Sequence, residues 1–93
     1  MDISFDPAKS ARNAAERGLP FDRTAEFDFQ MAVIEEDTRR VYPERRFVAL
    51  GWLDERLHVL CFTPAPGGIR VISFRKANAR EERRYEHTQQ DES

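Results

Sequence analysis

The spacing of apolar residues divides the chain near residue 31 into a helical part and an extended part. The first 30 residues predict two helices. Asp6 is a suitable N-cap with Pro7 at the first helical position, and Gly18 would end this helix in a left-handed turn. The helix carries a face of small residues that would allow close packing, formed by Ala8, Ala11, Ala14 and Ala15. A second, short helix is predicted to begin at Asp22, with a buried stripe of residues four apart, Phe21, Ala25 and Phe29.

Beyond residue 31 the apolar residues alternate, which predicts four strands: Met31–Glu35, Phe47–Leu53, Leu57–Thr63 and Ile69–Arg75. A tight turn at Asp54-Glu55 joins the second strand to the third, and the turn Pro64–Gly68 precedes the fourth. The second and third strands are apolar on both faces, so helices are expected to cover the sheet. Asp2–Phe5 is a candidate for a short additional edge strand.

A last helix is predicted to begin near Ala79, because Asn78 and Glu81 have the spacing of a capping box. This helix has few apolar residues, so it either packs weakly against the sheet or packs fully only when a partner protein binds. The polar residues after His87 predict a disordered tail over residues 88–93. The expected fold class is α+β, with two N-terminal helices, a four-stranded antiparallel sheet and a C-terminal helix in a single domain, residues 1–93.

The composition is that of a polar globular protein, with 93 residues, 34% of them charged, and a net charge of −2. No apolar run approaches the roughly 20 residues that a helix needs to cross a bilayer. The N-terminus does not have the pattern of a signal peptide. The lone Cys61 has no disulfide partner within the chain and is expected to be a buried small hydrophobe. We therefore expect a cytoplasmic protein without a membrane partner.

Charge is distributed unevenly along the chain. Residues 1–37 hold nine acidic and four basic side chains, whereas residues 38–86 hold six acidic and eleven basic ones. The segment Ile69–Glu86 combines three carboxylates with six cations, Arg70, Arg75, Lys76, Arg80, Arg83 and Arg84. Guanidinium groups bind phosphate and carboxylate with the same bidentate geometry. This strand–helix corner is therefore either an anion-binding surface, compatible with RNA, or a solvated charged face.

Arg75 stands where the last strand ends and the last helix begins. Strict alternation places it on the same face of the strand as Val71 and Ser73. There Arg75 could hold a phosphate, helped by backbone N–H groups at the helix start. It could equally form a salt bridge with Glu81 or Glu82, and the sequence favours neither alternative.

Most other catalytic classes lack their residues here. Two histidines and one cysteine, far apart in sequence, are too few for a zinc site, and there is no glycine-rich phosphate loop. We interpret His58 as structural, and the acidic run Glu35–Asp37 as a solvated turn rather than a cation site. A site without metal or cofactor, built from Arg, Lys, Tyr and a carboxylate, remains. Such a site cleaves RNA by using the ribose 2′-OH as internal nucleophile.

Four segments of the chain, in order, resemble the BrnT toxins of bacterial type II toxin–antitoxin systems: FDPAKSARNAAERGLPF, ERRFVALG, RLHVLCFT and IRVISFRKANAREERRYE. Together they extend from Phe5 to Glu86. The resemblance implies a small ribonuclease with a RelE-like fold. It also implies neutralisation by a DNA-binding antitoxin of the BrnA type, through which alone the chain would reach operator DNA.

The motifs of that family fall on Asp6, Lys9, Asn13, Gly18, Glu44-Arg45, Gly51, Ile72-Ser73, Arg75, Arg80, Glu81 and Tyr85. From the resemblance together with the basic segment Ile69–Glu86 we expect catalytic roles for Lys9, Arg70, Arg75 and Tyr85. We expect RNA binding by Arg17, Lys76, Arg80, Arg83 and Arg84. The cations would hold phosphate and stabilise the transition state, and Tyr85 would stack on a base or move a proton.

The chain departs from the family pattern at two places. Glu16-Arg17-Gly18 replaces a common Lys-His-Gly sequence at the end of the first helix, and Thr63–Pro66 replaces a charged turn. Without that histidine three functions stay open. The chain is an RNA-cleaving toxin, an inactive module that binds an antitoxin or acts as co-repressor, or an RNA-binding domain that does not cleave.

Overall fold

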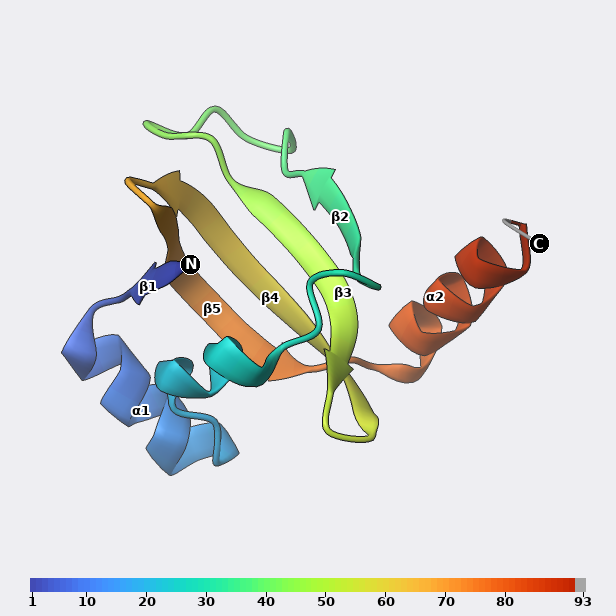
Figure 1. The fold of residues 1–93 in the computed structure, drawn as a ribbon, viewed down its shortest axis with the longest axis horizontal. Helices are drawn as coiled ribbons and strands as arrows, with labels where there is room; N and C mark the ends of the chain where they lie inside the picture. The colour runs from blue at the N-terminus through green and yellow to red at the C-terminus, as the bar shows by residue number, and fades with distance from the viewer. Residues whose placement is uncertain (92–93) are drawn as a thin grey trace.

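The computed structural model describes residues 1–91 and contains one five-stranded sheet with helices on both faces (Figure 1). The strands lie in the order β1-β5-β4-β3-β2. In chain order the elements are β1 (Asp2–Ser4), α1 (Pro7–Arg17), the 3₁₀ helix η1 (Phe21–Glu26), β2 (Val33–Glu36), β3 (Phe47–Leu53), β4 (Arg56–Ala65), β5 (Gly68–Lys76) and α2 (Ala79–Asp91). The α+β class is confirmed. No helix in the described part of the chain is long and apolar enough to span a membrane.

The sheet is mixed, which corrects the expected four antiparallel strands. The N-terminal edge strand exists, but it pairs with β5 in parallel, from Asp2 opposite Gly68 to Ser4 opposite Arg70. This approach requires glycine at position 68, because a Cβ there would lie 1.8 Å from the carbonyl oxygen of Asp2. The turn before β5 is shorter than the predicted Pro64–Gly68 and consists of Pro66 and Gly67. The φ of Gly67 is 71°, which fits the glycine position of a type II turn.

The caps of α1 are as predicted, but its alanine face is not buried. Asp6 accepts a hydrogen bond from the backbone N–H of Ala8, and Gly18 ends the helix with φ 69°. Three of the four alanines are exposed, and the buried side chain of α1 is Ser10, which accepts from the N–H of Phe21. Polar contacts rather than an apolar stripe therefore hold α1 in place.

Asn13 is the second polar attachment of α1. Its side-chain amide donates to the carbonyl oxygens of Leu19 (2.7 Å) and Phe74 (2.9 Å). The pairing of β1 with β5 ends at Arg70, so the outer edge of β5 beyond that residue has no neighbouring strand. Asn13 satisfies one of the carbonyl groups on this edge.

The second predicted helix is a 3₁₀ helix with Pro20, not Asp22, as N-cap. A 3₁₀ helix has three residues per turn, so the buried side chains recur at this interval instead of every four residues. They are Phe21, Thr24 and, just past the helix, Phe27, while Ala25 is exposed. The predicted stripe is wrong at Ala25 for this reason.

A bulge in β5 changes which residues share a face. Cys61 pairs with Ser73 and Phe62 with Val71, so Ile72 has no partner on β4. The extra residue reverses the alternation between Val71 and Ser73. Val71 consequently lies in the same core as Phe74, and not with Ser73 and Arg75 as strict alternation predicted.

Each face of the sheet has its own apolar core. The larger core lies under α1 and η1 and includes Leu19, Phe21, Phe27, Leu53, Leu60, Phe62 and Phe74. The smaller one lies under α2 and consists of Leu50, Leu57, Val59, Ala77 and Tyr85, with Val33 and Val48 at its border. α1 and α2 thus occupy opposite faces of the sheet (Figure 1).

The predicted capping box of α2 is present. The side chain of Asn78 accepts from the N–H of Glu81 (2.8 Å), and the side chain of Glu81 accepts from the N–H of Asn78 (2.9 Å). The helix continues to Asp91, so it includes the first four residues of the segment for which a disordered tail is expected. Thr88 is half-buried, and its hydroxyl donates to the carbonyl oxygen of Arg84. Residues 92 and 93 of the predicted tail lie outside the described residues.

We expect Asn13→Ala to lower the free energy of unfolding by about 1–3 kcal/mol, because two part-buried carbonyl groups lose their donor. Urea denaturation measures the change. The matched control is Arg12→Ala on the exposed side of the same helix, which should alter stability by no more than about 0.5 kcal/mol. Equal effects of the two substitutions would contradict the anchoring role of Asn13.

Candidate functional site

A groove of about 580 Å³ lies on the face of the sheet that α2 only partly covers. Apolar side chains form its floor: Val33, Val48, Leu50, Val59 and Cys61. Its walls are α2 on one side and the loop between β2 and β3 on the other. The volume is within the range typical of ligand sites, roughly 300–1,000 Å³. Three arginines line the groove, Arg39, Arg75 and Arg84.

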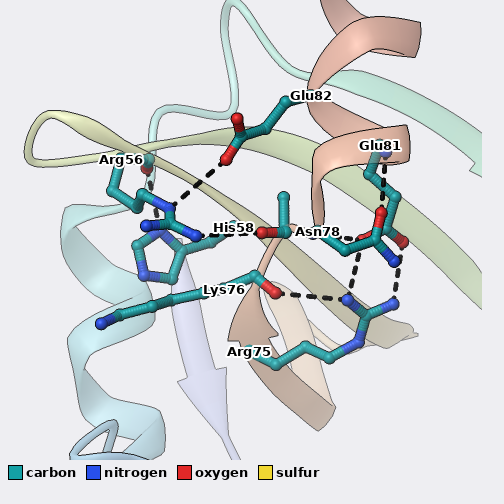
Figure 2. A network of polar contacts seen from close by, with 8 residues as sticks. Arg56, His58, Arg75, Lys76, Asn78, Glu81 and Glu82 are labelled. Atoms are coloured by element: carbon teal, nitrogen blue, oxygen red, sulfur yellow. Dashed lines mark hydrogen bonds and ion pairs between the residues drawn. The ribbon is translucent and has the colours of Figure 1, made fainter.

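The Arg75 guanidinium forms a bidentate ion pair with Glu81. Both nitrogen–oxygen distances are 2.8 Å, and Nη1 also donates to the carbonyl oxygen of Lys76 (Figure 2). Glu81 is the same residue that closes the capping box of α2. The Arg75 side chain lowers the pKa of the Glu81 carboxyl and the carboxylate raises that of Arg75. Of the two sequence alternatives for Arg75, the salt bridge is the one observed.

Arg84 and Arg39 are also paired with carboxylates. Arg84 contacts Glu35 of β2 across the end of the groove. Arg39 donates two hydrogen bonds to Asp37 (3.0 and 2.9 Å), whose side chain is 3% exposed and also accepts from Tyr42. These bonds, those from Arg39 above all, hold the pKa of Asp37 well below its usual range. These bonds join residues of the loop between β2 and β3 to one another, so they fix the conformation of this wall of the groove.

The three carboxylates of the acidic run Glu35–Asp37 pair with arginine side chains. Glu36 accepts from Arg45, so each of the three carboxylates has its own guanidinium partner. Within residues 1–91 no group of three or more His, Cys, Asp or Glu side chains is placed to hold a metal ion. With Glu81, four carboxylates line the groove against three arginines.

Tyr85 is buried and holds α2 to the sheet. It is 5% exposed, and its hydroxyl donates to the carbonyl oxygen of Met31 (3.0 Å). Its ring meets the Trp52 ring edge-on at 5.9 Å. In this arrangement the Tyr85 ring has no face free for a nucleotide base, so the geometry favours a positioning role.

The remaining six of the nine predicted site residues are exposed, and none of their side chains forms an ion pair with another residue described by the structure. They are Lys9 and Arg17 on α1, Arg70 and Lys76 on β5, and Arg80 and Arg83 on α2. α1 lies on the face of the sheet opposite the groove, so the structure does not bring Lys9 or Arg17 together with Arg75 (Figure 1).

His58 has the environment of a structural residue. It is 4% exposed, and its Nδ1 lies 2.9 Å from the carbonyl oxygen of Arg56 (Figure 2). Its ring packs on that of Phe74. Burial lowers the pKa of the imidazole, which favours the neutral form. Burial also raises the pKa of the Cys61 thiol in the floor of the groove.

The loop between β2 and β3 supplies a part of the site that the sequence did not predict. Arg39 and its support from Asp37 and Tyr42 were not expected, because Asp37 belongs to the acidic run that was interpreted as a solvated turn. The available signal was the spacing of an acidic residue two positions before an arginine, in Asp37 with Arg39 and in Glu44 with Arg46, which form local ion pairs.

Residues 5–81 match the family described as the ribonuclease toxin BrnT of type II toxin–antitoxin systems. No curated protein matches the chain.

We expect the docking of α2 to weaken in acid through Glu81. The pKa of Glu81 is lowered in the folded protein, so the ion pair stabilises the fold above the ordinary pKa of about 4.3 and is lost as the pH falls through the lowered value. Trp52 is the single tryptophan and lies against Tyr85, so its fluorescence reports whether α2 is docked.

Glu81→Gln should shift the Trp52 emission only slightly to longer wavelength at pH 7, because the bond of Tyr85 to Met31 still holds α2. It should also reduce the pH dependence of the emission below pH 5, because the substitution removes the titrating carboxylate. The control is Glu86→Gln, an exposed change on the same helix. If both variants keep the emission and the acid transition of the wild type, the pair with Arg75 does not hold α2.

Proposed function

The chain belongs to the BrnT family of ribonuclease toxins of type II toxin–antitoxin systems, and from this we propose that it is a metal-independent endoribonuclease whose cleavage site is the groove beside α2. Family membership supports ribonuclease activity in general. The location of the site is our proposal, and one observation supports it most. Arg75 and Arg84 line the same groove, and each is held by a carboxylate that a phosphate can replace.

The exchange follows from the shape of the guanidinium group. Arginine binds carboxylate and phosphate through the same pair of parallel N–H donors. A phosphodiester entering the groove takes the place of Glu81 on Arg75. Glu81 then loses its cationic partner, which is the main cause of its lowered pKa. Its proton affinity therefore rises towards that of an ordinary glutamate when substrate is bound.

This change gives the groove the groups that RNA cleavage needs. The released Glu81 carboxylate accepts the proton of the ribose 2′-OH, and the 2′-oxygen forms a bond to phosphorus. The bond to the 5′-oxygen breaks, which leaves a 2′,3′-cyclic phosphate. The 5′-oxygen takes a proton from water, and the hydroxide that remains takes the proton from Glu81, so the carboxylate is restored. Arg75 and Arg84 stabilise the negative charge that builds on the phosphoryl oxygens.

The other predicted residues receive supporting roles in this proposal. Arg70 and Lys76 on β5 do not line the groove, and as exposed cations without an ion pair to another described residue they contribute positive potential to the surface around it. Lys9 and Arg17 contribute it from the opposite side of the sheet. Tyr85 positions α2 through its bond to Met31 rather than touching RNA.

Membership in a type II toxin–antitoxin family implies a protein antitoxin as partner. We propose that this partner is of the BrnA type, that it blocks RNA cleavage, and that operator DNA is bound only through it. The toxin then acts in the cytoplasm, where cleavage of RNA stops translation and growth.

A second candidate function is a module that binds an antitoxin without cleaving RNA. The pairing of all three groove arginines favours it, since each cation among the described residues that line the groove has a carboxylate partner. The departure at Arg17, where the family commonly has histidine, points the same way. Cleavage assays separate the two candidates.

We expect the wild-type chain to cleave RNA without added metal and to arrest growth, and Arg75→Ala to reduce single-turnover cleavage by about 10²–10³-fold, as for the loss of one transition-state donor. The control is Arg23→Ala, which breaks the distant ion pairs with Glu26 and Asp54 and should leave cleavage unchanged. Trp52 fluorescence verifies that α2 stays docked.

Glu81→Gln gives the complementary result. It should keep RNA binding, because Arg75 remains and loses its competitor, while cleavage falls by about 10²–10⁴-fold through the loss of the proton acceptor. A wild-type chain that neither cleaves RNA nor arrests growth would refute the proposed function, and binding of the antitoxin but not of RNA would then identify the second candidate.

A further inference from the structure

The charges of α2 are sorted onto opposite sides of the helix. With 3.6 residues per turn and Tyr85 facing the sheet, Arg80, Arg83 and Arg84 lie on adjoining positions of one side. We call these three residues the cationic flank. Glu82 and Glu86 lie on the other side, where Glu82 contacts Arg56 near the turn between β3 and β4.

The stability of the helix does not account for the cationic flank. Like charges three or four residues apart destabilise a helix by about 0.2–0.5 kcal/mol for each pair. Arg80 is in the first turn, where the positive end of the helix dipole disfavours a cation. Arg80 and Arg83 are exposed, and neither forms an ion pair with a residue of the described chain. An anion from outside the protein would offset these costs.

The cationic flank continues the groove. Arg84 belongs to both, since it lines the groove and contacts Glu35 at its end. On the opposite wall Arg39 and Arg46 of the loop between β2 and β3 pair locally with Asp37 and Glu44. Arg45 pairs with Glu36, so Arg40 is the one arginine of this loop without an ion pair to another described residue. The cationic flank has two such arginines beside Arg84, so the positive potential that leads out of the groove is stronger over α2.

We propose that the cationic flank binds the backbone phosphates of the RNA nucleotides next to the cleaved bond. This inference rests on the proposed function, because it takes the groove as the cleavage site. RNA is a polymer, so a strand that places one phosphate on Arg75 and Arg84 must leave the groove, and over α2 it meets Arg80 and Arg83. The flank thus makes the enzyme select strands that extend beyond the cleaved bond.

Salt dependence of binding tests the inference without requiring cleavage. The probe is a 12-nucleotide 2′-O-methyl RNA of mixed sequence, which has no free 2′-OH, compared with its 3-nucleotide counterpart. Each phosphate contact with a single strand contributes about −0.7 to the slope of log K against log salt concentration. The double variant Arg80→Gln/Arg83→Gln should therefore reduce the magnitude of the slope for the long probe by about 1.4 and lose the preference for the long probe.

The double variant Arg12→Gln/Arg40→Gln is the matched control. It removes two exposed cations without ion pairs to other described residues, on α1 and on the loop between β2 and β3, and so changes the net charge equally. It should keep most of the wild-type slope. Equal effects of the two double variants would overturn the inference, because net charge alone would then explain binding.

The outcomes also separate the inference from the proposed function. A wild-type chain that binds the long probe through the flank but cleaves no RNA would refute the proposed function and support the flank. An unchanged slope in Arg80→Gln/Arg83→Gln would overturn the inference, whether or not the protein cleaves RNA. If that variant instead loses affinity for the antitoxin, the flank belongs to a protein interface.

Discussion

The ion pair between Arg75 and Glu81 is the contact on which this site depends. α2 brings little apolar surface to the sheet, since Tyr85 is its buried apolar residue and Ala77 precedes it. Arg75 fixes the first turn of the helix to the end of β5, and Glu81 at the same time closes the capping box with Asn78. One carboxylate thus starts the helix and docks it.

The same contact connects stability with chemistry. A phosphate that replaces Glu81 gains a guanidinium partner, but it also removes one of the contacts that hold α2. The helix stays attached through Tyr85 and through the pair of Glu82 with Arg56. Exchange of anions on Arg75 is therefore compatible with a docked helix, and its cost is confined to one ion pair. A site of this kind resists adventitious anions, because each must compete with an intramolecular carboxylate.

Local signals in the sequence predicted much of this fold. The cap at Asp6, the left-handed end at Gly18, the capping box at Asn78 and strand β3 follow from residues close in sequence, and the structure has them all. Features that depend on distant residues were not predictable. The parallel pairing of Asp2–Ser4 with β5 joins residues from opposite ends of the chain. The bulge at Ile72 reverses which side chains of β5 share a face, and no proline or glycine in the sequence indicates it. The partner of Arg75 could not be predicted for a chemical reason, because the two parallel N–H donors of its guanidinium group fit carboxylate and phosphate equally.

The exchange of Glu81 for phosphate on Arg75 is the central claim, and the pKa of the Glu81 carboxyl tests it most directly. Carbon-13 NMR of the side-chain carboxyl, titrated with and without the uncleavable 2′-O-methyl RNA, measures this pKa in the intact protein. The account predicts a lowered pKa in the free protein and a rise towards the ordinary value of about 4.3 when RNA is bound. A pKa that stays equally low at saturating RNA would contradict it, because Glu81 would still be paired with Arg75.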